Sequence, residues 1–133
     1  MRNKLQIPIK ELIAIFKINP AIKLVYFFGS KAIGKQGPMS DFDFAVYLDE
    51  NDKNRIIDDR LSLMNKLSRL LKTDKIDIVI LNTVQGTELK YNIISQGKLI
   101  YEKQPFRVIV EPKILNEYFD FHYLLSKYKL TKA

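Results

Sequence analysis

The segment FFGSKAIGKQGPMSDFDFAVYLD, Phe27–Asp49, joins two apolar runs through a glycine-rich loop and then places two aspartates one residue apart. Residues i and i+2 of a strand point to the same face of a sheet. Asp41 and Asp43 should therefore project side by side, while Phe42 and Phe44 face the core. This spacing predicts a strand, loop and strand unit that carries a pair of carboxylates at the start of a buried strand.

Apolar periodicity around this unit predicts alternating strands and helices. We expect strands at Ile22–Phe28, Asp41–Leu48, Lys75–Leu81 and Lys98–Tyr101. We expect helices at Ile9–Ile18, from a cap at Asn51 or Asp52 with the apolar stripe Ile57, Leu61, Met64, Leu67 and Leu71, at Gly86–Ser95, and at Pro112–Tyr128. This order predicts one α/β or α+β domain over residues 1–133, with a mixed sheet flanked by helices and a long C-terminal helix.

The supply of metal-binding side chains restricts the chemistry. The chain has no cysteine and one histidine, His122, so thiolate sites, disulfides and histidine clusters are excluded and any metal must be held by oxygen. No apolar run reaches the roughly 18 residues of a membrane span, and the basic, interrupted N-terminus does not predict a signal peptide. We expect a cytoplasmic protein that does not enter a membrane.

Positive charge is concentrated near the glycine-rich loop. The net charge is +7, and residues 1–40 hold seven Lys or Arg against one acid, Glu11. Such an excess favours an anionic partner, which can be a nucleoside triphosphate, RNA or an acidic protein face, although many basic surfaces are only solvated. Because the sequence shows no stacking platform or arginine cluster, we expect protein contact rather than direct nucleic-acid binding.

The paired aspartates are the first candidate site. Two carboxylates held close together repel each other unless a cation lies between them, and oxygen ligands favour Mg²⁺ or Mn²⁺. Asp77 alternates with Ile76 and Ile78, so its side chain leaves the apolar face and can join the pair. The alternative is that Ser40 and Asp41 form a turn or cap and that Asp43 and Asp77 are solvated strand residues.

The turn at Gly29 and Ser30 is the second candidate site. Glycine lets the backbone approach an anion closely, Ser30 adds a hydroxyl, and a helical turn opening there would aim N–H groups at phosphate. Lys31 and Lys35 can neutralise phosphates, although loop lysines are often only solubilising charges. A strand followed by Gly-Ser is often just a turn, and its combination with three carboxylates is what indicates a nucleotide site.

These residues together resemble a known family. Gly29-Ser30, then ten residues, then Asp41-Phe42-Asp43 is similar to the GSx10DxD signature of the nucleotidyltransferase superfamily that includes DNA polymerase beta, and Asp77 matches its third carboxylate. The short length, the segment GKLIYE (Gly97–Glu102) and the ending EYFDFHYLL resemble the minimal nucleotidyltransferase (MNT) branch, prokaryotic antitoxins paired with HEPN-domain ribonuclease toxins. The resemblance extends over nearly the whole chain and implies a polymerase-beta-like fold.

The resemblance also implies roles for the residues of the motif. Asp41 and Asp43 would bind two Mg²⁺ ions, Asp77 would bind the ion beside the attacking hydroxyl, and Gly29 and Ser30 would hold the phosphates of ATP. For the MNT branch it implies that a tyrosine hydroxyl of the HEPN toxin is adenylylated and the toxin silenced, within a hetero-oligomer. Many relatives carry arginine where this chain has Lys31 and Ile33, and Lys31 or Lys35 is expected to supply the phosphate-binding charge, with Lys31 favoured.

Two other functions remain open from the sequence. The same chemistry can act on a small-molecule hydroxyl or an RNA end, and an antitoxin can block its toxin by binding alone. The C-terminal helix has more apolar residues than one stripe needs, so it either packs with its aromatic edges exposed or meets a partner. His122 lies among these aromatics, and we expect it to be a core or surface residue outside the site.

Overall fold

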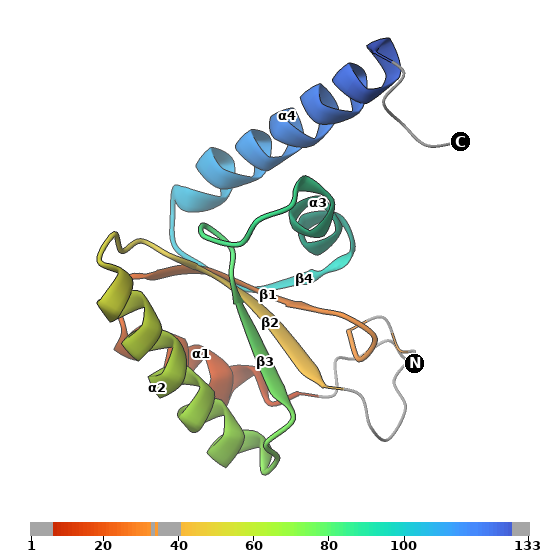
Figure 1. Ribbon diagram of the computed structural model, residues 1–133. Coiled ribbons are helices and arrows are strands. Elements are labelled where there is room, and N and C mark those ends of the chain that lie inside the picture. Colours follow the sequence, from red (N-terminus) through yellow and green to blue (C-terminus); the bar gives the residue numbers. More distant parts are fainter. Residues whose placement is uncertain (1–6, 33, 35–40, 129–133) are drawn as a thin grey trace.

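The computed structural model describes residues 7–32, 34 and 41–128. In this part of the chain, a four-stranded sheet lies between two pairs of helices (Figure 1). The elements are α1 (Ile9–Ile18), β1 (Ile22–Phe28), β2 (Phe42–Leu48), α2 (Lys53–Leu71), β3 (Ile76–Ile80), α3 (Thr87–Gln96), β4 (Lys98–Glu102) and α4 (Phe106–Lys127). The predicted fold class, a mixed sheet flanked by helices with a long C-terminal helix, is confirmed.

The sheet topology brings three chain segments together at one end of the strands. The strand order is β3-β2-β1-β4; β1 pairs antiparallel with β2 and β4, and β2 pairs parallel with β3. A parallel pair needs a crossover connection, which α2 supplies. The starts of β2 and β3 therefore lie beside the end of β1, where the glycine-rich loop begins.

Each face of the sheet has its own apolar core. The face covered by α1 and α2 buries Phe27, Phe44 and Ile78 with Leu12 and Phe16 of α1. The face covered by α3 and α4 has a smaller core, built from Leu24, Tyr26, Ala45, Leu81, Ile93, Val110 and Ile114. The alternation predicted for Phe42 and Phe44 holds, since both pack on the first face.

Helix α2 begins directly after Asp52, which is one of the two predicted N-cap residues. The Asp52 side chain accepts a hydrogen bond from the Asn54 N–H at 2.9 Å, which satisfies a free amide of the first turn. The predicted apolar stripe was partly wrong, because Ile57 and Leu61 are 55% and 51% exposed. The buried face is turned so that Leu63 and Leu67 face the sheet, with Ile56, Met64, Leu70 and Leu71 partly buried beside them.

Helix α4 begins six residues earlier than predicted. Pro112 was expected to open the helix, but it lies inside it, and the first turn starts at Phe106. Proline removes one helical hydrogen bond. Phe106 and Val110 pack on the second core from this added turn, and that burial favours the longer helix.

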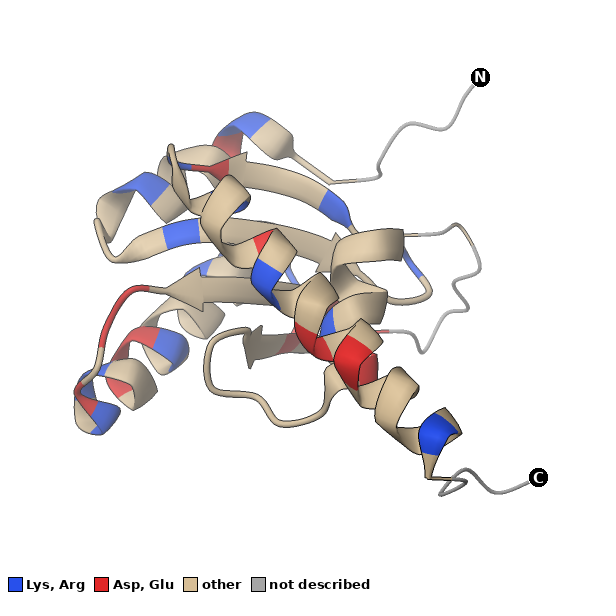
Figure 2. Cartoon of the chain, turned by 90° about the horizontal axis from the view of Figure 1, so that it is seen from above, with Lys and Arg blue, Asp and Glu red and all other residues tan. Residues whose placement is uncertain are grey.

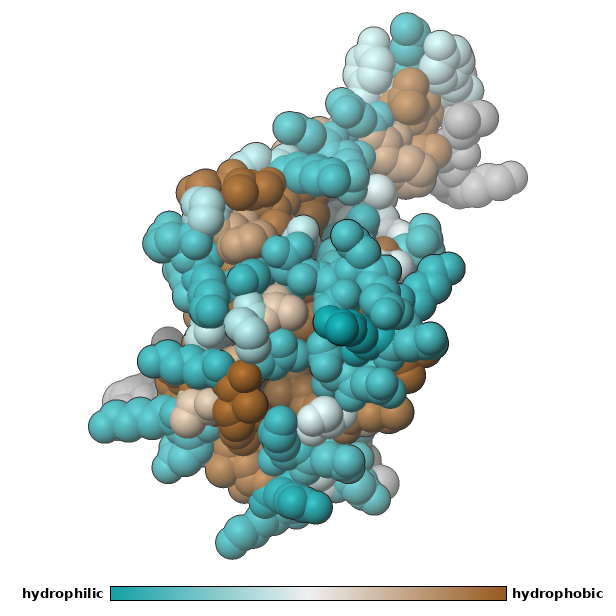
Figure 3. Space-filling view, turned by 90° about the vertical axis from the view of Figure 1, so that its left-hand side faces the viewer, coloured by the Kyte–Doolittle hydropathy of each residue, from teal (hydrophilic) through white to brown (hydrophobic). Residues whose placement is uncertain are grey.

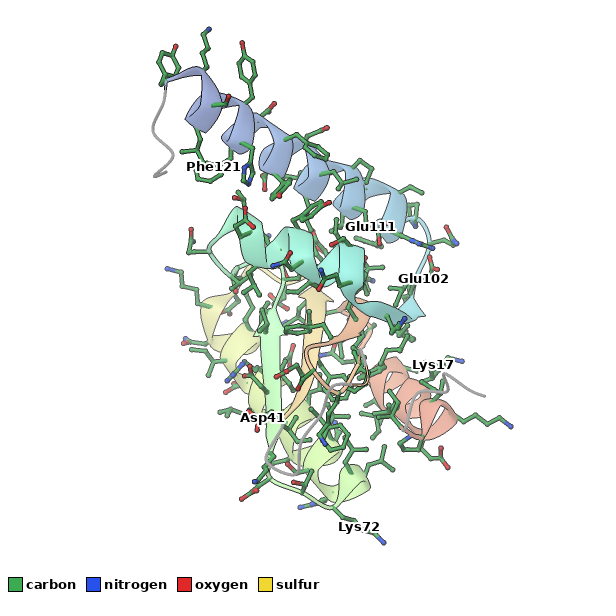
Figure 4. All side chains as sticks on the ribbon, turned by 90° about the vertical axis from the view of Figure 1, so that its right-hand side faces the viewer. Lys17, Asp41, Lys72, Glu102, Glu111 and Phe121 are labelled. Atoms are coloured by element: carbon green, nitrogen blue, oxygen red, sulfur yellow. The ribbon has the colours of Figure 1, made fainter. Side chains whose placement is uncertain are left out.

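A polar contact fixes the start of α4 on the sheet. The buried Tyr26 hydroxyl of β1 donates a hydrogen bond to Glu111 of α4, and Arg107 pairs with both Glu111 and Glu102. Figure 4 shows Glu102 and Glu111 close to each other beside the first turns of α4. Burial and the neighbouring Glu111 carboxylate raise the pKa of Tyr26 far above its usual range. The hydroxyl therefore stays protonated and acts as a donor.

Helix α4 as a whole is sparsely covered. Its buried residues are Val110 and Ile114, and its exposed large apolar side chains are Val108, Ile109, Phe119, Phe121, Tyr123, Leu124 and Tyr128. Apolar surface is visible at the level of this helix in Figure 3. The first half packs on the sheet and the aromatic edges are exposed, as the first of the two sequence interpretations expected, and contact of this surface with a partner stays a prediction. Within the described residues, no helix has the length and apolar content that a membrane crossing requires.

Candidate functional site

Asp43 and Asp77 stand side by side on neighbouring strands. They are register partners in the parallel pair of β2 and β3, so both side chains project from the same face, toward α3 and α4. The other side chains that leave these strands on this face are Ala45, Tyr47 and Val79, which lie in or against the second core. The prediction that Asp77 leaves the apolar face of α1 and α2 and lies near Asp43 therefore agrees with the geometry.

Gly29 closes against Asp43 from β1. Phe28 is the register partner of Asp43, and Gly29 follows it with φ at +83°, a conformation that other residues seldom adopt. A Cβ atom built on Gly29 would overlap the Asp43 carboxylate. The Ala32 N–H donates to the Gly29 carbonyl at 3.1 Å, so one hydrogen-bonded turn contains Ser30 and Lys31. The backbone can approach the carboxylate this closely only because position 29 has no side chain.

The electrostatics of Asp43 reflect this crowding. Partial burial, followed by the negative charges of Asp77 and then Asp41, raises the pKa of Asp43 to about 6. Like charges at short range disfavour the ionised form of each other. Asp43 is therefore the centre of the group, and the charges of both Asp77 and Asp41 act on it.

Asp41 lies at the outer side of this group. It directly precedes β2 and is exposed (Figure 4). Its negative charge acts on Asp43 and contributes to the raised pKa of that residue. Ile33, Lys35 and Ser40, which the sequence analysis considered at this loop, lie outside the described residues.

Lys31 points away from the carboxylates. Its ammonium lies 4.7 Å from the centre of the Phe42 ring, and Phe42 packs with Phe27 on the face of α1 and α2. This is a cation–π contact that holds the Lys31 side chain against the Phe42 ring. To bind phosphate beside the carboxylates, the Lys31 side chain would therefore have to leave the Phe42 ring and rotate past the start of β2.

Arg60 is a residue near the site that the sequence analysis did not select. Its Nε donates to the Ile78 carbonyl at 2.8 Å, and its Nη2 lies 3.9 Å from Asp77 Oδ1. The signal was its place in α2: Arg60 is four residues after Ile56 and three before Leu63, so it belongs to the sheet-facing side. The predicted apolar stripe ran through Ile57 and Leu61, so it did not place Arg60 on the sheet-facing side of α2.

The donor chemistry fits a hard divalent cation. Within residues 7–32, 34 and 41–128, no three or more His, Cys, Asp or Glu side chains form a ready-made metal cage. Mg²⁺ commonly takes one or two carboxylates and completes its shell with water and substrate phosphates. The register pair Asp43 and Asp77 supplies two such carboxylates, and their mutual repulsion is the kind that a cation relieves.

Elsewhere the described charges do not form a single patch. Acidic and basic positions are interspersed over the elements rather than separated onto two faces (Figure 2). His122 lies on α4, where it pairs with Glu88 of α3 and packs against the Tyr118 ring. It is a partly exposed surface residue, as expected from the sequence.

Comparison with known proteins gives a consistent result. Residues 10–106 match the protein family described as "Polymerase beta, Nucleotidyltransferase". The protein adenylyltransferase MntA of Aphanizomenon flos-aquae (strain 2012/KM1/D3) is 34% identical over 90 residues, which are 63% of this chain and 59% of MntA. The matched region thus spans less than two thirds of that relative.

Solved structures of similar fold come from toxin–antitoxin pairs. A chain of a toxin–antitoxin structure with AMP-PNP has a TM-score of 0.73 and 26% identity, over 93% of this chain and 94% of that chain. A chain from the structure of the tri-AMPylated Shewanella oneidensis HEPN toxin in complex with MNT antitoxin has a TM-score of 0.65 and 24% identity, over 92% and 90%. At that identity the second similarity supports the fold alone.

Proposed function

Because the chain belongs to the polymerase beta nucleotidyltransferase family, we propose that it transfers AMP from ATP to a hydroxyl group of a HEPN ribonuclease toxin and so acts as its antitoxin. The hydroxyl is that of a tyrosine. The observation that carries the proposal is the register pair of Asp43 and Asp77 with Gly29 closed against it. The similarity to MntA, a protein adenylyltransferase, and to a toxin–antitoxin structure with AMP-PNP supports the choice of nucleotide and partner.

Different residues of the site serve the nucleotide and the acceptor. Gly29 and Ser30 bind the phosphates of ATP, because their turn closes against Asp43 and phosphates bound there would lie next to a cation held by that carboxylate. Lys31 leaves the Phe42 ring to add positive charge when the triphosphate arrives. Asp77 lies on β3, the edge strand, and its half-exposed side chain faces the direction from which an acceptor can enter.

Asp41, Asp43 and Asp77 are the residues that hold two Mg²⁺ ions. When bound, these ions stabilise negative charge on the acceptor oxygen and on the departing pyrophosphate. The protein contributes the fixed spacing of the carboxylates, since Asp43 and Asp77 are set by hydrogen-bonded strands rather than by a loop. Placement on rigid elements favours in-line attack on the α-phosphorus.

Mass spectrometry of a co-expressed HEPN protein tests the proposal. The wild-type chain should leave an AMP adduct on a tyrosine of the toxin, and Asp43→Asn should leave none while the two proteins still purify together. Asp49→Asn, at the far end of β2, is a matched control that should keep the adduct. Protection of cells by Asp43→Asn without any adduct would instead support an antitoxin that acts by binding alone. An adduct formed by wild type only on a small molecule or an RNA end would contradict the proposed acceptor.

A further inference from the structure

Arg60 reaches the acidic group from the opposite face of the sheet. Helix α2 packs on the face that buries Ile76, Ile78 and Ile80, whereas Asp77 projects from the other face. Because β3 is the edge strand, the Arg60 side chain can pass around it and bond to a carbonyl of that strand. One guanidinium thus links the crossover helix, the edge strand and a carboxylate of the site.

The two contacts of Arg60 differ in kind. The bond from Nε to the Ile78 carbonyl is 2.8 Å, which is a fixed hydrogen bond. The approach of Nη2 to Asp77 Oδ1 is 3.9 Å, which is a charge contact without a hydrogen bond. The guanidinium is held by the backbone, and the carboxylate beside it keeps its oxygen lone pairs for another ligand.

This arrangement offsets the repulsion between the register partners. Asp43 and Asp77 repel each other when both are ionised, and an unrestrained Asp77 side chain would turn outward from the edge strand. A positive charge anchored at the Ile78 carbonyl attracts Asp77 and limits that movement. Side chains that orient metal ligands in this way change metal affinity or activity by about 10–100-fold when they are removed.

We propose that Arg60 is a positioning residue, which holds the Asp77 carboxylate beside Asp43 so that the two can bind one divalent cation. The proposal rests on the proposed function, because it assigns Arg60 a role toward the same metal site. Arg60 acts through Asp77 and does not touch the nucleotide. Its planar fork can serve the carbonyl and the carboxylate at once, which a lysine ammonium at that place cannot do equally well.

Binding of Mn²⁺ to the nucleotide-free protein, measured by calorimetry, tests the proposal without any turnover. Arg60→Gln should weaken Mn²⁺ binding about tenfold. Arg60→Lys should recover only part of the loss. Arg55→Gln is the matched control: Arg55 lies on the same helix, 3.9 Å from Glu50, and is 73% exposed, so its loss should leave Mn²⁺ binding unchanged.

The direction of the change in Mn²⁺ affinity distinguishes a positioning role of Arg60 from a purely electrostatic one. If Arg60 only adds positive charge near the site, its removal should tighten Mn²⁺ binding, and that result would overturn the proposal. Unchanged Mn²⁺ affinity together with lower stability in urea would also overturn it, because Arg60 would then be structural. In an Asp77→Asn background, Arg60→Gln should have no further effect on Mn²⁺.

Failure of the metal site itself gives a different result. If the wild-type chain binds no Mn²⁺ with or without ATP, the proposed function fails first. If the wild type binds Mn²⁺ and Arg60→Gln binds it equally well, only the role of Arg60 is lost. Arg60→Met provides a second variant should Arg60→Gln fail to fold, because its aliphatic chain keeps the packing against the sheet-facing side of α2.

Discussion

Two polar groups lie on the same face of the sheet and differ in how their charges are matched. The anchor group is Tyr26, Glu102, Arg107 and Glu111, in which a hydroxyl and a cation satisfy the carboxylates. The carboxylate group is Asp41, Asp43 and Asp77, in which like charges face one another and Arg60 approaches from one side. The carboxylates of the anchor group have partners within the protein, whereas those of the carboxylate group face one another, and the proposed metal ions would offset their repulsion.

From this difference we expect that the anchor group stabilises the fold and that the carboxylate group serves binding. A buried hydroxyl that donates to a carboxylate contributes to stability, and its loss leaves an acceptor unsatisfied. A carboxylate crowded by two others opposes folding of the metal-free protein. Removing a polar atom should therefore have opposite effects on stability in the two groups.

The largest expected effect is on catalysis by the carboxylate group. Asp43→Asn keeps the size of the side chain and removes its charge, so AMP transfer should fall by about 10³-fold, because metal ions supply several kcal/mol of transition-state stabilisation. Single-turnover transfer from ATP to the toxin measures this fall, with Tyr26→Phe from the anchor group as the control. A transfer rate for Asp43→Asn within tenfold of the wild type would remove Asp43 from the reaction.

Gly29 offers the next largest effect and a matched control. Gly29→Ala places a Cβ in the Asp43 carboxylate and strains a positive φ, so it should lower stability by about 2–3 kcal/mol and weaken Mg²⁺-dependent ATP binding. Gly34 has a similar φ of +78°, and among the described residues no atom lies within 4 Å of an added Cβ. Gly34→Ala should therefore show the backbone strain alone, about 1 kcal/mol, with ATP binding retained. Urea unfolding and calorimetry measure both, and equal effects of the two variants would mean that Gly29 does not act through Asp43.

The pattern of the sequence predicted the parts of the molecule that depend on local rules. Strand alternation placed Asp43 and Asp77 on one face, and the capping rule gave Asn51 or Asp52, of which Asp52 is the N-cap. Long-range contacts were not predictable, because the bond of Tyr26 to Glu111 and the reach of Arg60 around β3 depend on how the elements pack. The start of α4 was missed for a related reason, since the packing of Phe106 outweighs the lost hydrogen bond at Pro112.

In the anchor group, removal of one polar atom should lower the free energy of unfolding, whereas in the carboxylate group it should raise it. Tyr26→Phe removes only the hydroxyl that donates to Glu111, and it should lower the free energy of unfolding by about 2 kcal/mol. Urea unfolding at neutral pH measures the loss, and Tyr123→Phe, on an exposed position of α4, is the matched control with little expected effect. A Tyr26→Phe protein as stable as the wild type would mean that Glu111 is satisfied by Arg107 and water, and that the two groups differ less than their geometry indicates.

The smallest expected effect is the pH dependence of the metal-free fold. The pKa of Asp43 is raised from its usual 3.8 to about 6 in the folded chain, so the folded state binds more protons than the unfolded state between these values. Stability should then fall as pH rises from about 4 to about 6, by about 1 kcal/mol once solvent screening of this half-exposed group is allowed for. Asp43→Asn should lack this component, so the difference between variant and wild type in urea unfolding isolates it from other carboxylates. Above pH 6 the variant should be the more stable protein, and saturating Mg²⁺ should reduce its advantage because the ion offsets the repulsion in the wild type. A variant less stable than the wild type above pH 6 would mean that Asp43 is a stabilising residue like those of the anchor group.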